Sequence, residues 1–144
     1  MSRVQVAFPD VFLFETELVV RVSDLNYGAH LGHDSVLTLM QEARVLFYRQ
    51  LGFKDEISFD GEVGQIIADV AIQYKSESFL GDQLIIRIAV DEITRVGFDL
   101  LYLIINKANA KEVALGKTGI VCFNYNTRKV APIPASLKSS LTAS

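Results

Sequence analysis

The sequence predicts an α+β fold in which an antiparallel sheet of five or six strands wraps around one long helix. One segment, residues 34–51, has the 3.6-residue periodicity of an amphipathic helix, and most other apolar segments alternate with a period of two. Turn residues separate these segments. Because an apolar helical stripe is buried against one face of a sheet, we expect the order β-α-β-β-β-β with the helix at the centre.

Length and composition favour one folded, soluble domain. The 144 residues suffice for a single core, half of them are hydrophobic, and no apolar run approaches the ~20 residues of a membrane span. We expect a domain core at about 11–130 and a loosely ordered tail at 131–144, which is rich in serine, alanine and proline. The net charge of −3 and the scattered lysines and arginines argue against nucleic acid as a partner.

The cysteine content and the N-terminal sequence predict a reducing, cytoplasmic setting. Cys122 is the single cysteine, and its place inside an apolar strand suits a small buried residue better than a nucleophile. The first residues, MSRVQVAFPD, lack the basic segment and apolar run of a secretory signal.

The predicted strand before the helix spans residues 11–22, and its shared apolar face comprises Phe12, Phe14, Leu18, Val20 and Val22. The helical stripe of residues 34–51 comprises Val36, Leu39, Met40, Ala43, Leu46, Phe47 and Leu51. Asp34 or His33 suits the N-cap of this helix, and Gly52 suits the position just past its end.

Four more strands are predicted after the helix and a loop at 52–63. Their segments are 66–74, with Ile66, Ala68, Val70, Ile72 and Tyr74 on one face; 84–90; 98–105; and about 112–125. The segment 98–105 is apolar on both faces, so its outer face also needs a cover. Since no second helix is evident, we expect another subunit to provide that cover, in a homodimer that could pair further into a tetramer.

Polar and titratable residues concentrate immediately before the helix. Both histidines of the chain, His30 and His33, lie there together with Gly28 and Gly32. Backbone N–H groups are free at the start of a helix, so we expect the chemistry of the protein to occur at this point.

The strand order, the single long helix and the segment DLNYGAHLGHDSVLTLMQEAR (24–44) resemble the hotdog-fold acyl-CoA thioesterases of the 4-hydroxybenzoyl-CoA thioesterase type. Gly81-Asp82 before a strand, and Arg128-Lys129 followed by Pro132-x-Pro134, are further points of similarity. The resemblance covers nearly the whole chain. It implies hydrolysis of an acyl-CoA or acyl-carrier thioester at sites formed between two subunits, with no metal and no redox cofactor.

Thioester hydrolysis requires donors for the carbonyl oxygen and a group that activates water. We expect the backbone N–H groups of residues 31–35, at the positive end of the helix dipole, to be the donors. Gly28 and Gly32 allow close approach of the backbone, although they could instead serve only the turn. Tyr27, Gly32 and His33 are the expected substrate contacts in this loop.

The activating group is not evident, because Asn26 stands where the resembling family usually carries its catalytic aspartate when the two are aligned on Glu42-Ala43-Arg44. An amide cannot accept a proton, so Asn26 could orient water, bind the thioester carbonyl, or merely satisfy the loop backbone.

Three residues remain as candidate bases. His30 ranks first because an imidazole accepts protons near neutral pH, and plant acyl-carrier-protein thioesterases, which resemble this segment, use a histidine in this neighbourhood. Asp34 ranks second, although it could simply cap the helix. Glu42 lies nine residues after His33, similar to the spacing of the catalytic carboxylate in the phenylacetyl-CoA thioesterase branch, but glutamates on polar helical faces are commonly solvated.

Coenzyme A would require basic residues at the mouth of the site, and the candidates near strand ends are Lys75, Arg95, Arg128 and Lys129. Motifs of serine hydrolases, zinc proteases and nucleotide-binding loops are absent from the sequence. The remaining alternative to an enzyme is a non-catalytic acyl-thioester binding or scaffold protein, since the usual aspartate is missing.

Overall fold

The computed structural model describes residues 3–142 of the chain. The predicted order β-α-β-β-β-β is confirmed, and a 3-10 helix (η1), a short strand and a second helix are added to it. The elements are β1 (Phe14–Val19), η1 (Val22–Asp24), α1 (His33–Gln50), β2 (Val63–Tyr74), β3 (Gln83–Asp91), β4 (Gly97–Asn106), β5 (Glu112–Asn124), β6 (Lys129–Val130) and α2 (Ala135–Thr142).

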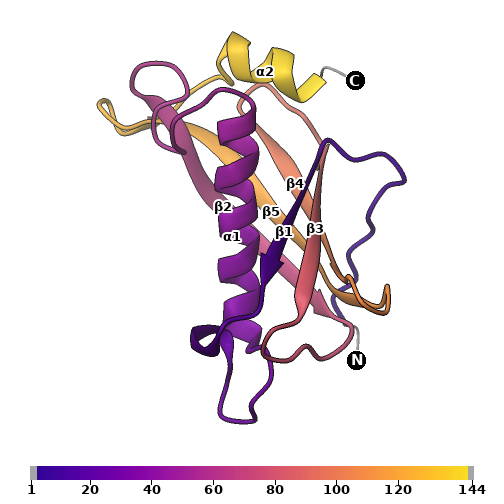
Figure 1. Ribbon diagram of the computed structural model, residues 1–144. Helices are drawn as coiled ribbons and strands as arrows, with labels where there is room; N and C mark the ends of the chain where they lie inside the picture. Colours follow the sequence, from indigo (N-terminus) through magenta and orange to yellow (C-terminus); the bar gives the residue numbers. More distant parts are fainter. Residues whose placement is uncertain (1–2, 143–144) are drawn as a thin grey trace.

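The strands form one antiparallel sheet in the order β1-β3-β4-β5-β2, with β6 paired to the end of β5. Figure 1 shows α1 lying along one face of this curved sheet. The strands β1 and β2 are therefore the two edges of the sheet, and β2 is much the longer of the two. None of the helices within residues 3–142 is long and apolar enough to cross a membrane.

The helix α1 begins one residue earlier than the sequence suggested, and its N-cap is Gly32, so the assignment of the cap to Asp34 or His33 is wrong. Gly52 does follow the end of the helix, with φ +100°, as expected. The predicted stripe is buried at Val36, Leu39, Met40, Ala43 and Phe47, and Arg44 and Tyr48 are buried with it.

Close packing of α1 on the sheet depends on small residues in β5. A Cβ atom at Gly116 would lie 2.5 Å from Cε of Met40, so a larger residue there would push the helix away. The rest of the contact is made by side chains of β3 and β4 that point toward the helix, namely Leu84, Ile86, Ile88, Leu100, Tyr102 and Ile104.

The predicted face of the strand at 66–74 is partly wrong, because the register of β2 against β5 shifts between Ile67 and Asp69. Such a bulge places an extra residue in one strand and inverts the alternation beyond it. Ile72 pairs with Gly116 on the helix side of the sheet, whereas Ile66 pairs with Val121 and lies on the opposite side.

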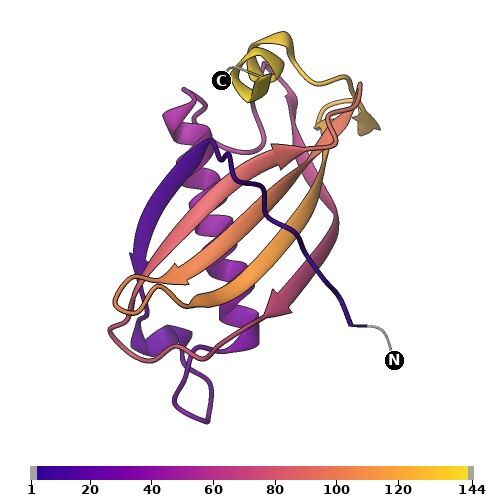
Figure 2. The same cartoon turned by 90° about the vertical axis from the view of Figure 1, so that its right-hand side faces the viewer.

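The first strand is shorter than the predicted 11–22, and the segment before it has a different role. Residues 3–13 cross the outer face of the sheet, the face away from α1 (Figure 2). Val6 N donates to Oε1 of Gln73 at 3.1 Å, and the Arg87 guanidinium lies 4.8 Å from the ring centre of Phe12.

The outer face of β4 is consequently covered by the chain itself around Leu103. Leu103 and Leu115 are buried, and they share a hollow with Phe8 and Phe12 of the crossing segment. The expectation that another subunit must cover this face is therefore wrong at these positions, because residues 3–13 serve that purpose.

The tail was expected to be loosely ordered from residue 131, but most of it forms α2. Leu137 and Leu141, four residues apart, are both buried, and Ile133 is buried before them. Figure 1 shows α2 beyond the C-terminal end of α1. Residues 143–144 of the predicted tail lie outside the described residues.

Candidate active site

A cleft of about 340 Å³ opens where the loop before α1 meets the end of β2. It is lined by Asn26, His30, Leu31, His33, Tyr74, Lys75, Ser76 and Glu77. A larger hollow of about 620 Å³ lies near the β3–β4 turn, but its lining contains carboxylates and small residues and no imidazole. The smaller cleft is therefore the better equipped for acid–base chemistry.

The loop that forms one wall of the cleft is tied together by Asn26. Its side-chain Oδ1 accepts hydrogen bonds from Gly28 N at 2.9 Å and His30 N at 3.4 Å. Ala29 between them has φ +64°, which shows how tightly the chain turns. The oxygen thus satisfies the loop backbone, while Nδ2 has no hydrogen-bond partner among residues 3–142 and can donate into the cleft.

The backbone donors expected at residues 31–35 divide into two groups. Leu31 N donates to Ser78 O at 2.8 Å and Gly32 N to Asp24 O at 3.0 Å, so these two N–H groups are occupied and that part of the expectation is wrong. The N–H groups of His33, Asp34 and Ser35 have no acceptor in the described part of the chain. Three donors at the positive end of α1 therefore remain for a ligand.

His30 lies across the cleft wall with its ring edge-on to Phe79, the ring centres 6.3 Å apart. Its Nε2 is 3.8 Å from Oε1 of Glu77. A Cβ at Gly28 would lie 3.1 Å from this Nε2, so glycine leaves the room that the imidazole occupies. Gly28 consequently positions His30 in addition to permitting the turn.

His33 is the first residue of α1, and it contacts β2 through Tyr74. The Tyr74 hydroxyl donates to the backbone oxygen of His33 at 3.0 Å, and the two rings are edge-on at 6.5 Å. Burial, and secondarily the charge of Asp34, raises the pKa of Tyr74. These contacts fix the start of α1 against the end of β2.

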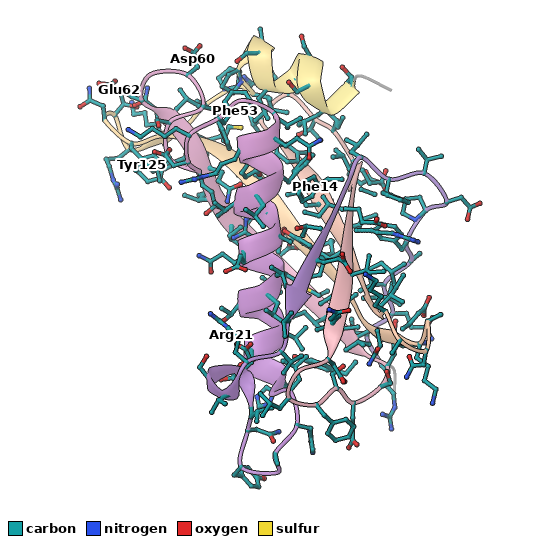
Figure 3. The ribbon with its side chains drawn as sticks, in the orientation of Figure 1. Phe14, Arg21, Phe53, Asp60, Glu62 and Tyr125 are labelled. Atoms are coloured by element: carbon teal, nitrogen blue, oxygen red, sulfur yellow. The ribbon has the colours of Figure 1, made fainter. Side chains whose placement is uncertain are left out.

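The two carboxylate candidates lie outside the lining of the cleft. Asp34 is exposed in the first turn of α1, and its Oδ1 is so close to Gly32 that a Cβ there would lie 2.7 Å away. Glu42 is exposed more than two turns along the helix. It is one of the charges acting on Arg21, which pairs with Asp24 and which Figure 3 shows beside the lower half of α1.

The expected substrate contacts are brought together only in part. His33 and Lys75 line the cleft, Gly32 is buried at the cap, and Tyr27 is fully exposed at the loop tip. Arg95 lies in the β3–β4 turn, and the nine residues of β3 separate the two ends of the sheet by about 30 Å. Arg95 therefore does not reach the cleft of its own chain. The same holds for Arg128 and Lys129, which lie near the same end of the sheet.

Sequence reasoning missed Tyr74 and Glu77 as cleft residues. The alternation predicts Tyr74 only as the last residue of a strand, and it gives no role to Glu77. The polar run Lys75–Ser78, two residues before the Gly81-Asp82 turn, was the available signal. It marks the end of β2, and the connection that follows pairs with the loop before α1 through the bridge between His30 and Phe79.

A long helix held by a curved antiparallel sheet is the hotdog fold, and free N–H groups beside an imidazole suit an acyl-thioester substrate. The model of the thioesterase-like superfamily matches residues 20–141. The chain therefore belongs to the thioesterase-like superfamily, which places it among the thioester hydrolases. This confirms the resemblance drawn from the sequence. Comparison with curated proteins finds no match.

Solved structures support the same fold. The 1,4-dihydroxy-2-naphthoyl-CoA thioesterase of Synechocystis is 20% identical, with a TM-score of 0.82 over 89% of this chain and 94% of that one. A gentisyl-coenzyme A thioesterase is 23% identical, with a TM-score of 0.79 over 90% and 100%. A Staphylococcus aureus protein solved in complex with CoA is 12% identical, with a TM-score of 0.82 over 94% and 85%. At these identities the likeness is one of fold.

Proposed function

We propose that the protein is an acyl-CoA thioester hydrolase that releases a carboxylic acid and free CoA. The observation that carries this proposal is the cleft lined by His30 and His33, because His33 is the first of three successive residues at the start of α1 whose N–H groups have no acceptor within residues 3–142. The likeness to CoA thioesterases and to a CoA-bound protein supports CoA as the thiol carrier.

The N–H groups of His33, Asp34 and Ser35 hold the carbonyl oxygen and stabilise the negative charge that develops on it. Donors already in place at a helix start need no rearrangement during the reaction, which is the source of their catalytic effect. Nδ2 of Asn26, in the lining of the cleft, is a further donor.

His30 is the proposed base. It accepts a proton from water as the water oxygen attacks the carbonyl carbon, and it returns the proton to sulfur when the C–S bond breaks. Asp34 is the second candidate because it lies in the same helical turn as the donors. Glu42 is not in the lining of the cleft, so in this proposal it can serve only a site shared with another subunit.

The same proposal includes a homodimer formed through β2. This strand has a neighbour on only one side within residues 3–142, and Ile67 and Val70 on its helix side are 39% and 44% exposed. A long edge strand with exposed apolar side chains favours pairing with a second copy. A tetramer would require a surface other than the outer-face region covered by residues 3–13.

Lys75 at the cleft is the proposed contact for the phosphates of CoA, and Arg95 could contribute only from another subunit.

The buried, unpaired Cys122 fits a reducing cytoplasm as the proposed location.

Release of free thiol from short, long and aromatic acyl-CoAs, and from an acyl carrier protein, tests the proposal directly. We expect hydrolysis of at least one acyl-CoA, and a fall in kcat on the order of a hundredfold in His30→Ala. The matched variant is Asp34→Ala, which the proposal expects to affect kcat less.

The alternative is a non-catalytic acyl-thioester binding protein, and the observation that favours it is Asn26 in place of a carboxylate. Binding of a non-hydrolysable acyl-CoA without turnover of any thioester would support this alternative. If turnover stayed unchanged in each of His30→Ala, Asp34→Ala and Glu42→Ala, none of these three residues would be the catalytic base.

A further inference from the structure

We propose that Glu77 is a positioning residue for His30. Its carboxylate orients the imidazole so that Nε2–H points toward Glu77 and Nδ1 is left to accept the proton from water. The inference rests on the proposed function. Because Asn26 stands where a carboxylate is usual, it assigns Glu77 as the carboxylate of the site.

Glu77 and His30 are held on neighbouring stretches of backbone. Glu77 lies in the connection between β2 and β3, and the next residue, Ser78, accepts the hydrogen bond from Leu31 N at 2.8 Å. An antiparallel bridge joins His30 to Phe79. The two side chains thus come from paired segments, and their proximity follows from the backbone.

Glu77 contributes the sole carboxylate in the lining of this cleft, where Asn26 and Lys75 are the other long polar side chains beside the two histidines. The 3.8 Å between Oε1 and Nε2 is an ion-pair distance that a small side-chain rotation would shorten to a hydrogen bond. The side chains of Glu77 and His30 are 65% and 34% exposed, and Glu77 has no other ion-pair partner in the described residues, so it is free to make that rotation.

The imidazole has further neighbours besides Glu77. The Phe79 ring lies edge-on to it, and the bare backbone of Gly28 lies beside its Nε2 and Cδ2 atoms, whereas Nδ1 has no hydrogen-bond partner within residues 3–142. Fixing the proton on Nε2 therefore leaves Nδ1 with its lone pair directed away from Glu77.

In the resulting reaction one proton moves from water to Nδ1 of His30 and then from Nδ1 to sulfur. An O–H bond of water breaks, its proton passes to Nδ1, and the oxygen bonds to the carbonyl carbon, which gives an imidazolium beside the Glu77 carboxylate. Collapse of the tetrahedral intermediate breaks the C–S bond, and the thiolate takes the proton from Nδ1. Glu77 stabilises the transient imidazolium and is never itself protonated.

Turnover of Glu77→Gln tests the role of the charge. We expect kcat to fall on the order of tenfold with KM little changed, because an exposed pair contributes far less than a buried triad. The matched control is Glu62→Gln, an exposed glutamate that Figure 3 shows at the opposite end of the molecule from the loop before α1, and it should leave both constants unchanged. In a His30→Ala background, Glu77→Gln should have no further effect on the residual rate.

A second measurement does not depend on turnover. The chain has only two histidines, so ¹⁵N chemical shifts of the imidazoles, assigned with His33→Ala, report the tautomer of His30. At about pH 8, where a typical imidazole is neutral, we expect Nε2–H in the wild type and a mixture of tautomers in Glu77→Ala.

These outcomes separate the two proposals. If the wild type hydrolyses acyl-CoA while Glu77→Gln is fully active, or loses the same factor with and without His30, the role of Glu77 is refuted and the enzyme remains. If no thioester is hydrolysed, the proposed function fails, and the tautomer alone decides whether Glu77 orients His30. An unchanged tautomer in Glu77→Ala would refute the pairing.

Discussion

At the scale of single residues, Asn26 shows why the site differs from the pattern that its sequence resembles. Its oxygen closes the loop by accepting from Gly28 N and His30 N, which leaves only the amide nitrogen for a ligand. Proton transfer must therefore come from another group in the cleft, and His30 lines that cleft together with His33, the first of the residues with a free N–H group.

Cys122 illustrates the opposite case, a reactive residue type in an unreactive place. It is fully buried, and this burial raises the pKa of its thiol to about 11. The folded protein therefore holds the neutral thiol across the neutral range, and the expectation that Cys122 is not a nucleophile agrees with its surroundings.

We predict that Cys122 in the folded protein does not react with a thiol reagent at about pH 8 and reacts rapidly once the chain is unfolded in urea. Because the folded pKa lies above the ordinary value of 9.0, the stability that the neutral thiol contributes is complete below that value and is lost as the pH rises toward about 11. Rapid labelling of the native protein at pH 8 would contradict the buried position.

At the scale of elements, α1 carries a buried cation that periodicity alone did not reveal. Arg44 is 4% exposed; its Nε donates to Oε1 of Glu56 and its Nη1 to the Tyr102 hydroxyl at 3.2 Å. That hydroxyl also contacts Oγ1 of Thr118 at 2.8 Å. The helix, the loop after it and two strands are thus joined through one guanidinium.

We predict that Arg44→Met lowers the free energy of unfolding by about 3 kcal/mol. Removing one partner of a buried pair leaves the other charge uncompensated, and partial solvent access of Glu56 keeps the loss at the lower end of the usual range. Arg49→Met, on the exposed side of the same helix, is the control and should change the value little. Urea unfolding measures both, and equal effects of the two substitutions would refute the role of the buried pair.

Periodicity predicted α1 and the strands β2 to β5, because each of these elements buries a regular face. It could not locate the bulge in β2, since the extra residue that inverts the alternation leaves a sequence that still alternates. The helix α2 was missed because its two leucines lie in a tail of small polar residues, and their burial depends on contacts with the rest of the fold.

At the scale of the whole molecule, the crossing segment 3–13 accounts for the apolar residues on the outer face of β4. The buried Leu103 and Leu115 share a hollow with Phe8 and Phe12 of this segment, which Figure 2 shows passing over the outer face of the sheet. The sequence could indicate that a cover existed, but only the path of the chain identifies the cover.

We predict that deletion of residues 1–12 destabilises the protein by on the order of 3 kcal/mol and increases the binding of a hydrophobic dye. The physical reason is the exposure of the Leu103 and Leu115 side chains to water. Urea unfolding and dye fluorescence measure the effect, and the double substitution Phe8→Ser and Phe12→Ser should reproduce it more weakly. A truncated chain with unchanged stability would show that the segment does not cover the sheet.

We predict that Val70→Lys converts a homodimer into a monomer, because it places a charge on the exposed edge strand β2. The control is Val130→Lys, the same change at an exposed valine in β6. Sedimentation measures the mass of both variants, and a dimer that survives Val70→Lys would rule out assembly through this edge.

The site itself was predictable in part. The loop before α1, with Asn26 and His30, stood out because titratable residues and glycines gather at a helix start. The contributions of Tyr74, Lys75 and Glu77 depend on β2 ending beside that loop, and the unoccupied N–H groups could be distinguished from the occupied ones only from the backbone hydrogen bonds.

The most direct test is a crystal structure with a non-hydrolysable acyl-CoA analogue that keeps the carbonyl group. We predict that the carbonyl oxygen lies about 2.7–3.1 Å from at least one backbone nitrogen among His33, Asp34 and Ser35, with His30 facing the carbonyl carbon. An acyl group bound away from the start of α1, with those three N–H groups left in water, would contradict the account.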